Sequence, residues 1–334
     1  METVKVHTRQ RDYDIVLGHG ILKDLKQILG SCGRVFVISD DGVPKQYMDT
    51  VQAQYPDMNS FVFAQGEQSK NMNIYQQALS IMLKERYSRN DTVIALGGGV
   101  PGDLAGFVAA SYMRGVRFVN IPTTVLSQID SSIGGKTAID MDGIKNCVGA
   151  FWQPSLVLID PDTLKTLPKR QISNGLAEAV KEGVTSDPIL FHLFEQDDYM
   201  DHLDEIILRC LEIKKGIVER DERESGERKL LNFGHTYGHA YESYEHGQYY
   251  HGECVAMGMM TIVKNQEVKD RLRRVLQRLD LPLACDADDE AVISLIEHDK
   301  KADHDHVTIV QADQIGRGHL ENWTMQDIRK GLEQ

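Results

Sequence analysis

The sequence predicts an α/β domain with a mainly parallel sheet, followed by an all-helical domain. In the first half, short runs of β-branched residues alternate with patterns of helical period. From about Gln171 onward helical periods dominate, and turn residues cluster just before that point, in residues 160–170. Strand–helix alternation is typical of a parallel sheet with helices on its faces. We therefore expect one domain over residues 1–165, a second over 166–334, and a ligand-binding cleft between them.

The expected strands of the first domain are apolar, rich in valine and isoleucine, and bounded by turn residues. They lie at 34–40, 61–67, 91–99, 116–124 and 155–160, with helices at 73–87 and 103–113 between them. In the second domain, apolar residues recur at helical spacing. This spacing predicts helices at 171–184, 189–196, 203–220, 234–244, 252–280 and 289–299.

The composition narrows the class of protein. The chain has 334 residues, of which 41% are hydrophobic and 26% charged, as in ordinary globular proteins. Its formal net charge of -13 argues against nucleic acid or an anionic membrane as a partner. The five cysteines are odd in number and include no CxxC pair, which argues against a disulfide framework. With no apolar leader and no long apolar span, we expect a cytoplasmic protein that does not enter a membrane.

A glycine loop follows the third expected strand. Gly97, Gly99 and Gly102 have the GxGxxG spacing between a strand and a helix. Glycines let the backbone approach a pyrophosphate, whose charge a helix N-terminus stabilises. The acidic residue usual about 20 positions later is missing, since Asn120 stands there. Asp40, at the end of an earlier strand, could bind the ribose instead. The alternative is a tight turn packed without a ligand.

A polar segment over residues 128–146 contains a second set of candidates, Asp130, Lys136, Lys145 and Asn146. Two lysines and an amide near a glycine turn suit an oxyanion such as phosphate. The alternative interpretation is a solvated surface loop.

Polar residues on two of the expected helices are further candidates. Asn174, Glu178 and Lys181 lie on one face of helix 171–184, a pattern that is more often a solvated surface. Lys214 falls in the apolar stripe of helix 203–220, whereas Lys215 points away. A lysine in such a position either extends to solvent or reaches into a site.

The segment from Leu231 to Glu253 contains four histidines, His235, His239, His246 and His251. His235 and His239 are four residues apart, a spacing that can place two imidazoles on one metal ion. The residue after His235 is Thr236, so the HExxH motif is not present. Spacing alone favours His235 with His239 as the ligand pair. If the segment is helical, Arg228 and Asn232 lie on the same side as that pair.

Several longer stretches, in order and at matching spacing, resemble the 3-dehydroquinate synthases, a family of sugar phosphate cyclases. They are GGGVPGDLAGFVAASYMRG, IPTTVLSQIDSSIGGKTAID, KNCVGAFWQP, NGLAEAVKEG, DERESGERKLLNFGHTYGHAYE and HGECVAMGM. The resemblance implies conversion of 3-deoxy-D-arabino-heptulosonate 7-phosphate to 3-dehydroquinate and phosphate, in the shikimate route to aromatic amino acids. It also implies transient oxidation by NAD, phosphate elimination, re-reduction and an intramolecular aldol closure. The same resemblance implies a zinc or cobalt ion that assists as a Lewis acid, and a homodimeric enzyme.

The resemblance also implies roles for individual residues. The metal ligands become Glu178, His235 and His251, while His239 assists proton movement near the phosphate, supported by Glu224. The phosphate binders are Lys136, Asn146, Lys300 and Lys301, and Arg114 reaches the site from the second subunit. The contacts to substrate carboxylate and hydroxyls are Asp130, Lys181, Lys214, Arg228 and Asn232. The implied NAD contacts are Asp40, Glu67, Lys70, Gly98, Gly99, Asp103, Thr123, Thr124, Lys145, Thr163, Thr166 and Asn174.

The sequence departs from the family pattern beside some of these residues. Asp140 stands where asparagine is usual and Ile144 where glycine is usual, on either side of the loop that precedes Lys145 and Asn146. Glu182 replaces a common histidine or tyrosine. None of these changes removes an implied metal ligand, and we expect His246 to be a surface residue.

Three other functions remain as alternatives. Related cyclases use sedoheptulose 7-phosphate or glucose 6-phosphate, although the DSSIGGKTA segment favours dehydroquinate synthase over the aminoglycoside type. A metal-dependent polyol dehydrogenase of the glycerol dehydrogenase type would accumulate NADH. A non-catalytic nucleotide-binding protein would release no phosphate.

Overall fold

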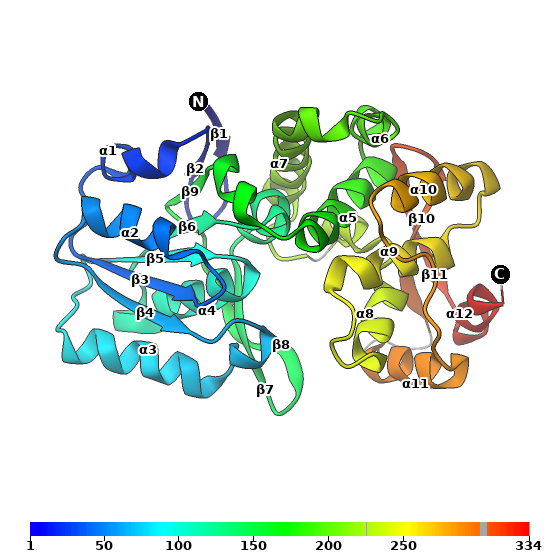
Figure 1. The fold of residues 1–334 in the computed structure, drawn as a ribbon. Coiled ribbons are helices and arrows are strands. Elements are labelled where there is room, and N and C mark those ends of the chain that lie inside the picture. Colours follow the sequence, from blue (N-terminus) through cyan, green and yellow to red (C-terminus); the bar gives the residue numbers. More distant parts are fainter. Residues whose placement is uncertain (225, 301–305, 334) are drawn as a thin grey trace. The chain divides into compact units, whose positions relative to one another are not determined.

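A computed structural model describes residues 1–224, 226–300 and 306–333, without the side chains of 298–300 (Figure 1). The chain forms two compact units. The first comprises Met1–Pro168 together with Lys214–Arg223, and the second comprises Lys169–Ile213 and Glu224–Gln334. The expected boundary at residues 165 and 166 lies close to the division at Lys169. The sequence did not predict that residues 214–223 group with the first unit.

The first unit is built on a seven-stranded sheet with the order β1-β2-β9-β6-β5-β3-β4. Its strands are β1 (Glu2–Val6), β2 (Tyr13–Leu17), β3 (Val35–Asp40), β4 (Asn59–Phe63), β5 (Thr92–Gly97), β6 (Arg117–Pro122) and β9 (Leu156–Ile159). Only the β1–β2 pair is antiparallel in this sheet. The predicted mainly parallel α/β fold is therefore confirmed.

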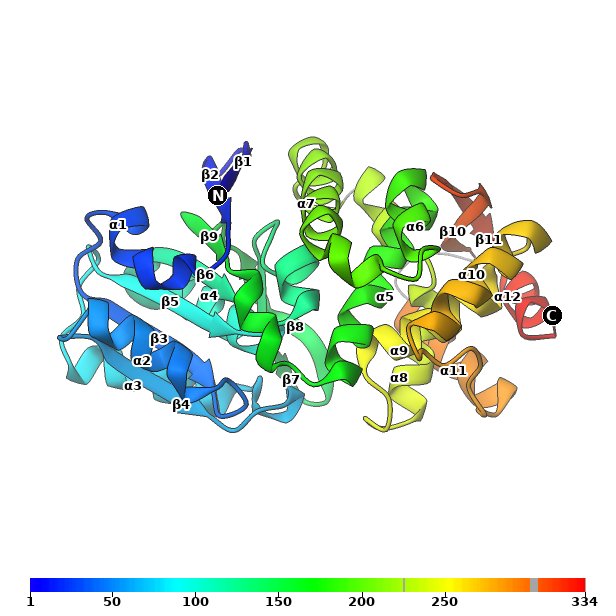
Figure 2. The same cartoon turned by 45° about the horizontal axis from the view of Figure 1, so that its top comes forward.

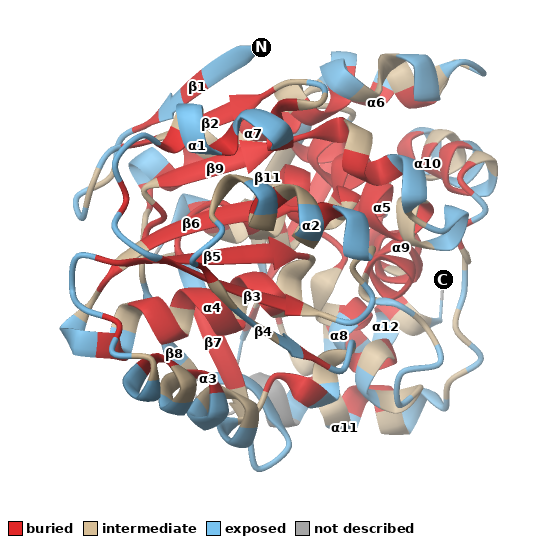
Figure 3. Cartoon of the chain, turned by 60° about the vertical axis from the view of Figure 1, so that its left-hand side comes forward, coloured by how far each residue is buried: buried red, intermediate tan, exposed pale blue. Residues whose placement is uncertain are grey.

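Helices cover both faces of this sheet, as Figure 2 shows. They are α1 (Leu25–Leu29), α2 (Lys45–Gln54), α3 (Met72–Lys84) and α4 (Gly99–Ser111). Alternate residues of β3 enter opposite cores, because side chains on a strand alternate between faces. Val35 and Val37 pack in the core that contains α1 and α2, whereas Phe36 and Ile38 pack in the core that contains α3 and α4. The central strands are buried on both faces (Figure 3).

The polar segment at 128–146 forms ordered structure rather than an irregular loop. One π-helical turn, Ser127–Ser131, precedes an antiparallel hairpin of β7 (Lys136–Met141) and β8 (Ile144–Phe151). The end of α7 (Leu203–Arg220) also belongs to this unit. Near this end Glu219 accepts a hydrogen bond from the His7 backbone N–H, and Glu222, just after the helix, accepts one from the Gln153 amide.

The second unit was predicted to be all-helical; it is mainly helical and also contains an antiparallel hairpin of β10 (Val307–Gln314) and β11 (Arg317–Trp323). Its helices, besides the first part of α7, are α5 (Lys169–Thr185), α6 (Pro188–Phe194), α8 (His235–Tyr244), α9 (His251–Ile262), α10 (Gln266–Arg278), α11 (Asp289–Lys300) and α12 (Met325–Leu332). Within the described residues, no helix has the length and apolar character needed to cross a membrane.

The predicted single helix over 252–280 is wrong, because the chain divides it into α9 and α10. Val263 leaves the helical conformation at φ -69° and ψ 121°. The Asn265 side chain then accepts a hydrogen bond from the Val268 backbone N–H and begins a new helix. Apolar periodicity continues across this break, so it could not reveal the cap.

Candidate active site

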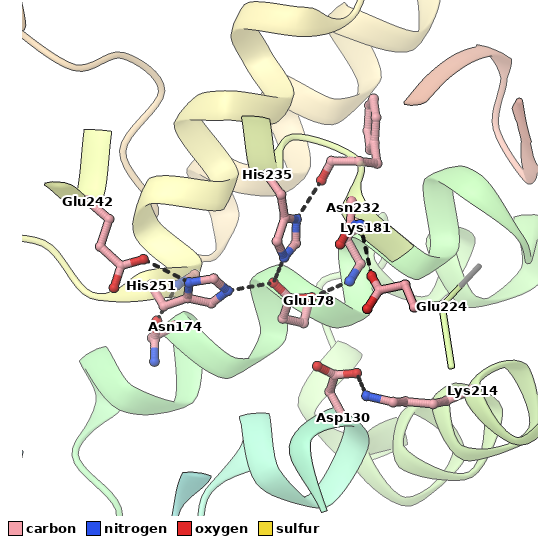
Figure 4. A network of polar contacts seen from close by, with 12 residues as sticks. Asp130, Asn174, Glu178, Lys181, Lys214, Glu224, Asn232, His235, Glu242 and His251 are labelled. Carbon is pink, nitrogen blue, oxygen red and sulfur yellow. Dashed lines mark hydrogen bonds and ion pairs between the residues drawn. The ribbon is translucent and has the colours of Figure 1, made fainter. Parts of the chain in front are cut away.

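Three helices of the second unit bring a buried carboxylate against two imidazoles (Figure 4). Glu178 lies on α5, and its side chain is 1% exposed. His235 is the first residue of α8 and His251 the first residue of α9. The Glu178 Oε1 atom is 3.6 Å from His235 Nε2 and 3.5 Å from His251 Nε2. Residues far apart in the sequence thus place two nitrogens and one oxygen around a single point.

Close packing of α5, α8 and α9 makes this convergence possible. A Cβ atom added at Gly252 would lie 1.9 Å from the Asn174 carbonyl oxygen of α5. One added at Gly258 would lie 2.0 Å from the Gly234 carbonyl oxygen, just before α8. Gly234 itself has a φ of 78°, a conformation that glycine adopts without steric cost. Glycines at the helix contacts therefore allow the backbones to approach closely enough for Glu178 and the histidines to meet.

Replacing Gly258 with alanine is expected to lower the free energy of unfolding by about 2 kcal/mol, because the added methyl group overpacks a backbone contact. The expected decrease in melting temperature is about 4 to 8 °C, measurable by circular dichroism. Gly216→Ala is the matched control, because its methyl group would meet only the flexible end of Arg220 at 3.2 Å. It should be neutral or stabilising. Equal melting temperatures for both variants would contradict the packing argument.

Each imidazole also has an oxygen atom within hydrogen-bonding distance of its other ring nitrogen, Nδ1. His235 Nδ1 is 3.1 Å from the Phe233 carbonyl oxygen, and His251 Nδ1 is 3.1 Å from Glu242 Oε2. An imidazole that donates through Nδ1 presents Nε2 as its metal-binding nitrogen. Both Nε2 atoms face Glu178, so both rings are oriented for coordination at the same point.

Neighbouring basic side chains keep the Glu178 carboxylate ionised. Burial alone would raise the pKa of Glu178, but Lys181, His235 and His251 outweigh burial and hold that pKa well below its usual value. Burial lowers the pKa of His235 to about 3. Burial also acts to lower the pKa of His251, but the neighbouring carboxylates of Glu178 and Glu242 raise it to about 10.

A divalent cation fits the residues that are present. Glu178 Oε1 is buried and forms no hydrogen bond with any described residue. Zinc binds imidazole nitrogen and carboxylate oxygen at about 2.0 to 2.2 Å, so two ligands of one tetrahedral ion lie a little over ~3 Å apart. The 3.5 and 3.6 Å separations are close to that value. Nitrogen and oxygen ligands of this kind suit zinc and cobalt.

His239 also lies in this cluster. One ring nitrogen from each of His235, His239 and His251 falls within 4.8 Å of the others. His239 is exposed, whereas the other two are partly buried. Both histidine pairs considered from the sequence are therefore geometrically possible, and the ligand set of Glu178, His235 and His251 stays a prediction.

The predicted polar face of α5 is not solvated. Every residue from Ser173 to Thr185 is buried, and Lys181 donates a hydrogen bond to the second carboxylate oxygen of Glu178. Such a buried pair orients both groups, because neither can move without leaving a charge unpaired.

The segment that carries Arg228, Asn232, His235 and His239 is not one continuous helix. A 3-10 turn over Glu227–Asn232 carries Arg228 and Asn232, and Gly234 separates it from α8. Arg228 is 2% exposed. The Asn232 amide donates to Glu224 Oε1 at 3.2 Å.

The predicted glycine loop lies in the first unit at a position suited to a nucleotide. β5 ends at Gly97 and α4 begins at Gly99, with Gly98 as the N-terminal cap. β3 is paired with β5 on one side and β4 on the other, while the chain leaves β5 toward β6. The carboxyl ends of β3 and β5 therefore form a topological switch point, where open α/β sheets bind ligands. Asp40 ends β3 at this edge, and burial raises the pKa of its carboxyl group.

A buried lysine connects three of the carboxylates near this turn. Lys70 Nζ is 2.6 Å from Glu67 Oε1, 3.2 Å from Asp103 Oδ2 and 4.0 Å from Asp140 Oδ1. Burial raises the pKa of Asp103 to about 6, although Lys70 acts in the opposite direction. Asp140 also accepts a hydrogen bond from the Asn146 backbone N–H at 2.7 Å. This departure from the family pattern thus stabilises Asn146 in its left-handed conformation, at φ 55°.

The other predicted residues divide between the two units. Thr123 and Thr124 follow β6, and Thr163 and Thr166 lie in the 3-10 turn Pro161–Thr166. Lys214 is buried and paired with Asp130 in the first unit. The exposed residues among these are Arg114, Lys136, Lys145, Asn146, Thr166 and, as expected, His246. The Lys300 side chain and Lys301 lie outside the described residues.

Two contacts of the second unit were not predicted. Asn174, an implied NAD contact, uses its amide inside this unit, accepting from Gly252 N at 2.7 Å and donating to Gln171 at 3.2 Å. Glu242 was not identified as a functional residue. Its position seven residues after His235 on α8 puts it on the same helix face, and this spacing could have revealed it.

Comparison with known proteins gives consistent matches across the chain. Residues 60–174 match the model of the 3-dehydroquinate synthase N-terminal domain, and residues 175–302 match that of the C-terminal domain. The 3-dehydroquinate synthase of Clostridium acetobutylicum is 38% identical over 353 residues, covering 99% of each chain.

Solved structures of similar fold include two sugar phosphate cyclases. The 2-epi-5-epi-valiolone synthase of Streptomyces hygroscopicus, with NAD+ and Zn2+ bound, is 25% identical with a TM-score of 0.87, covering 98% of this chain and 97% of that one. A 2-deoxy-scyllo-inosose synthase complexed with carbaglucose-6-phosphate, NAD+ and Co2+ has a TM-score of 0.90 and covers 99% of each chain. At 23% identity, the second likeness concerns the fold alone.

Proposed function

This chain belongs to the 3-dehydroquinate synthase family, and on that premise we propose that it converts 3-deoxy-D-arabino-heptulosonate 7-phosphate to 3-dehydroquinate and phosphate. The reaction breaks a carbon–oxygen bond and closes a carbocycle, which makes the enzyme a phosphate-eliminating lyase. We further propose that it uses NAD, that its divalent cation is zinc or cobalt, and that it acts as a homodimer in the shikimate route.

The observation that carries the proposal is the buried Glu178 carboxylate between His235 and His251. An ionised carboxylate with no hydrogen bond on one oxygen and two oriented imidazoles is a donor set with positions left for substrate. A bound divalent cation would supply Lewis acidity to the substrate carbonyl and hydroxyls. Bound NAD would supply a reversible hydride acceptor.

The residues of the second unit supply positioning and proton transfer. Lys181, held by Glu178, contacts substrate hydroxyls. Arg228 offers a planar guanidinium that matches a carboxylate in two hydrogen bonds. His239, whose ring centroid is 5.2 Å from that of His235, takes up or releases a proton. Glu224, whose carboxylate is oriented by a hydrogen bond from the Asn232 amide, supports this acid–base chemistry.

The residues of the first unit bind the cofactor and the substrate anion. The backbone at Gly98 and Gly99 approaches the pyrophosphate, and Asp40 accepts hydrogen bonds from the ribose. The other proposed NAD contacts are Glu67, Lys70, Asp103, Thr123, Thr124, Lys145, Thr163, Thr166 and Asn174. Lys136 and Asn146 donate to the phosphate, Lys214 and Asp130 contact hydroxyls or carboxylate, and Arg114 serves the partner subunit.

A phosphate-release assay tests this function. Purified protein with zinc and a small amount of NAD is given the heptulosonate phosphate, sedoheptulose 7-phosphate or glucose 6-phosphate. We expect turnover of the first at about 10²-fold or more above the others, because a substrate lacking a bound polar group leaves protein groups unpaired. NAD should be recycled, without accumulation of NADH.

Each alternative gives a different outcome of the same assay. Preferential turnover of another sugar phosphate would assign the chain to a neighbouring cyclase class. Net formation of NADH from a polyol would indicate a dehydrogenase. Absence of phosphate release from every substrate would contradict the catalytic proposal.

A further inference from the structure

We propose that Glu242 is a positioning residue that selects the metal-binding nitrogen of His251. This inference rests on the proposed function, because it concerns the metal site of the same enzyme. The juxtaposition is direct, since Glu242 Oε2 lies 3.1 Å from His251 Nδ1 while Glu178 Oε1 lies 3.5 Å from His251 Nε2 (Figure 4). The ring is held between two carboxylates from different helices.

The contact with Glu242 fixes both the tautomer and the orientation of the ring. When Nδ1 donates a hydrogen to Glu242, Nε2 is the nitrogen with a lone pair for a cation. A ring flipped by 180° about its Cβ–Cγ bond would turn carbon atoms toward both carboxylates and lose this hydrogen bond. The side chains of His251 and Glu242 are 28% and 19% exposed, so water competes only partly for the contact.

His235 is held in a different way. Its Nδ1 faces the Phe233 carbonyl oxygen, a neutral backbone acceptor. A carboxylate acceptor makes an imidazole a more basic ligand than a carbonyl acceptor does. Glu242 therefore makes His251 the stronger donor of the two, which spacing alone could not indicate.

The backbone around His251 is held independently of Glu242. Asn174 accepts a hydrogen bond from Gly252 N, and Arg170 Nε is 2.7 Å from Glu253 Oε1 at the start of α9. Removing Glu242 should therefore release the ring without displacing the helix. This separation lets an experiment distinguish positioning from general structural support.

The experiment compares Glu242→Ala and Glu242→Gln with the wild-type protein in metal binding, without substrate. Zinc affinity is measured by competition with a chelator, and the visible absorption spectrum of the cobalt-loaded protein reports ligand geometry. We expect Glu242→Ala to lose about 10- to 100-fold in zinc affinity and to change the cobalt spectrum. Glu242→Gln should recover part of the affinity, because its amide oxygen still accepts a hydrogen bond.

Glu245→Ala is the matched control, since Glu245 lies at the end of the same helix and contacts Cys285 instead. The control and both Glu242 variants should melt at the wild-type temperature without metal. Wild-type zinc affinity in Glu242→Ala, or an equal loss in Glu245→Ala, would overturn the inference and leave the proposed function intact. Failure of the wild-type protein to bind zinc or cobalt would overturn both.

Discussion

Replacing His251 with alanine is expected to abolish metal binding and to lower turnover by about 10³-fold, whereas His239→Ala keeps the metal and loses about 10²- to 10⁴-fold in rate. His251 is the imidazole held by Glu178 on one side and Glu242 on the other. Without it, the buried Glu178 carboxylate and His235 remain as two ligands, too few for a catalytic zinc site. His239 is exposed, as suits a group that exchanges protons with substrate or solvent.

Metal content per protein chain, measured after gel filtration, decides between the two ligand sets. His246→Ala serves as the control, because His246 is exposed and has no proposed role. If the His239 and His251 variants lost metal equally, His235 and His239, which are four residues apart, would both be metal ligands. That outcome would make the residue assignment taken from the family resemblance wrong, while the cluster itself would stand.

The elements that could be predicted from the sequence are those with a single dominant physical signal. Four strands of the parallel sheet are buried on both faces and are correspondingly rich in apolar residues, so their composition alone indicates them. These strands are β3, β5, β6 and β9. The exposed β8 strand has no such signal. The hairpins β7–β8 and β10–β11 and the strands β1 and β2 depend on pairing partners that a local pattern cannot identify.

Some residues of the candidate site could likewise be predicted from the sequence, and others could not. The glycine loop and the histidine cluster were recognisable because their residues are close in sequence. Glu178 was assigned by resemblance, since on local grounds its face of α5 predicts solvent exposure, yet that face is buried. Glu242 was missed because its importance arises only from the contact with His251, which comes from another helix.

Replacing Lys70 with methionine is expected to lower the free energy of unfolding by about 3 kcal/mol at pH 8, because a buried cation that neutralises carboxylates is lost. Lys70 is 4% exposed and lies within 3.2 Å of both Glu67 and Asp103. We therefore expect a melting temperature about 6 to 12 °C below that of the wild-type protein. Lys45→Met is the control, because Lys45 is 86% exposed in its ion pair with Asp49. Removing such an exposed pair should cost less than ~1 kcal/mol.

The pH dependence of this loss follows from Asp103. Its pKa of about 6 lies above its ordinary value of 3.8, so the folded protein binds more protons than the unfolded chain between those values. Its contribution to stability therefore decreases as the pH rises through that range and is constant above it. Without Lys70 the pKa of Asp103 should rise further, because the cation that lowers it is gone. The difference between Lys70→Met and wild type should accordingly be larger at pH 8 than at pH 5, and Asp103→Asn in the Lys70→Met background should reduce it. A difference independent of pH would mean that lost packing, rather than an unpaired carboxylate, explains the effect of removing Lys70.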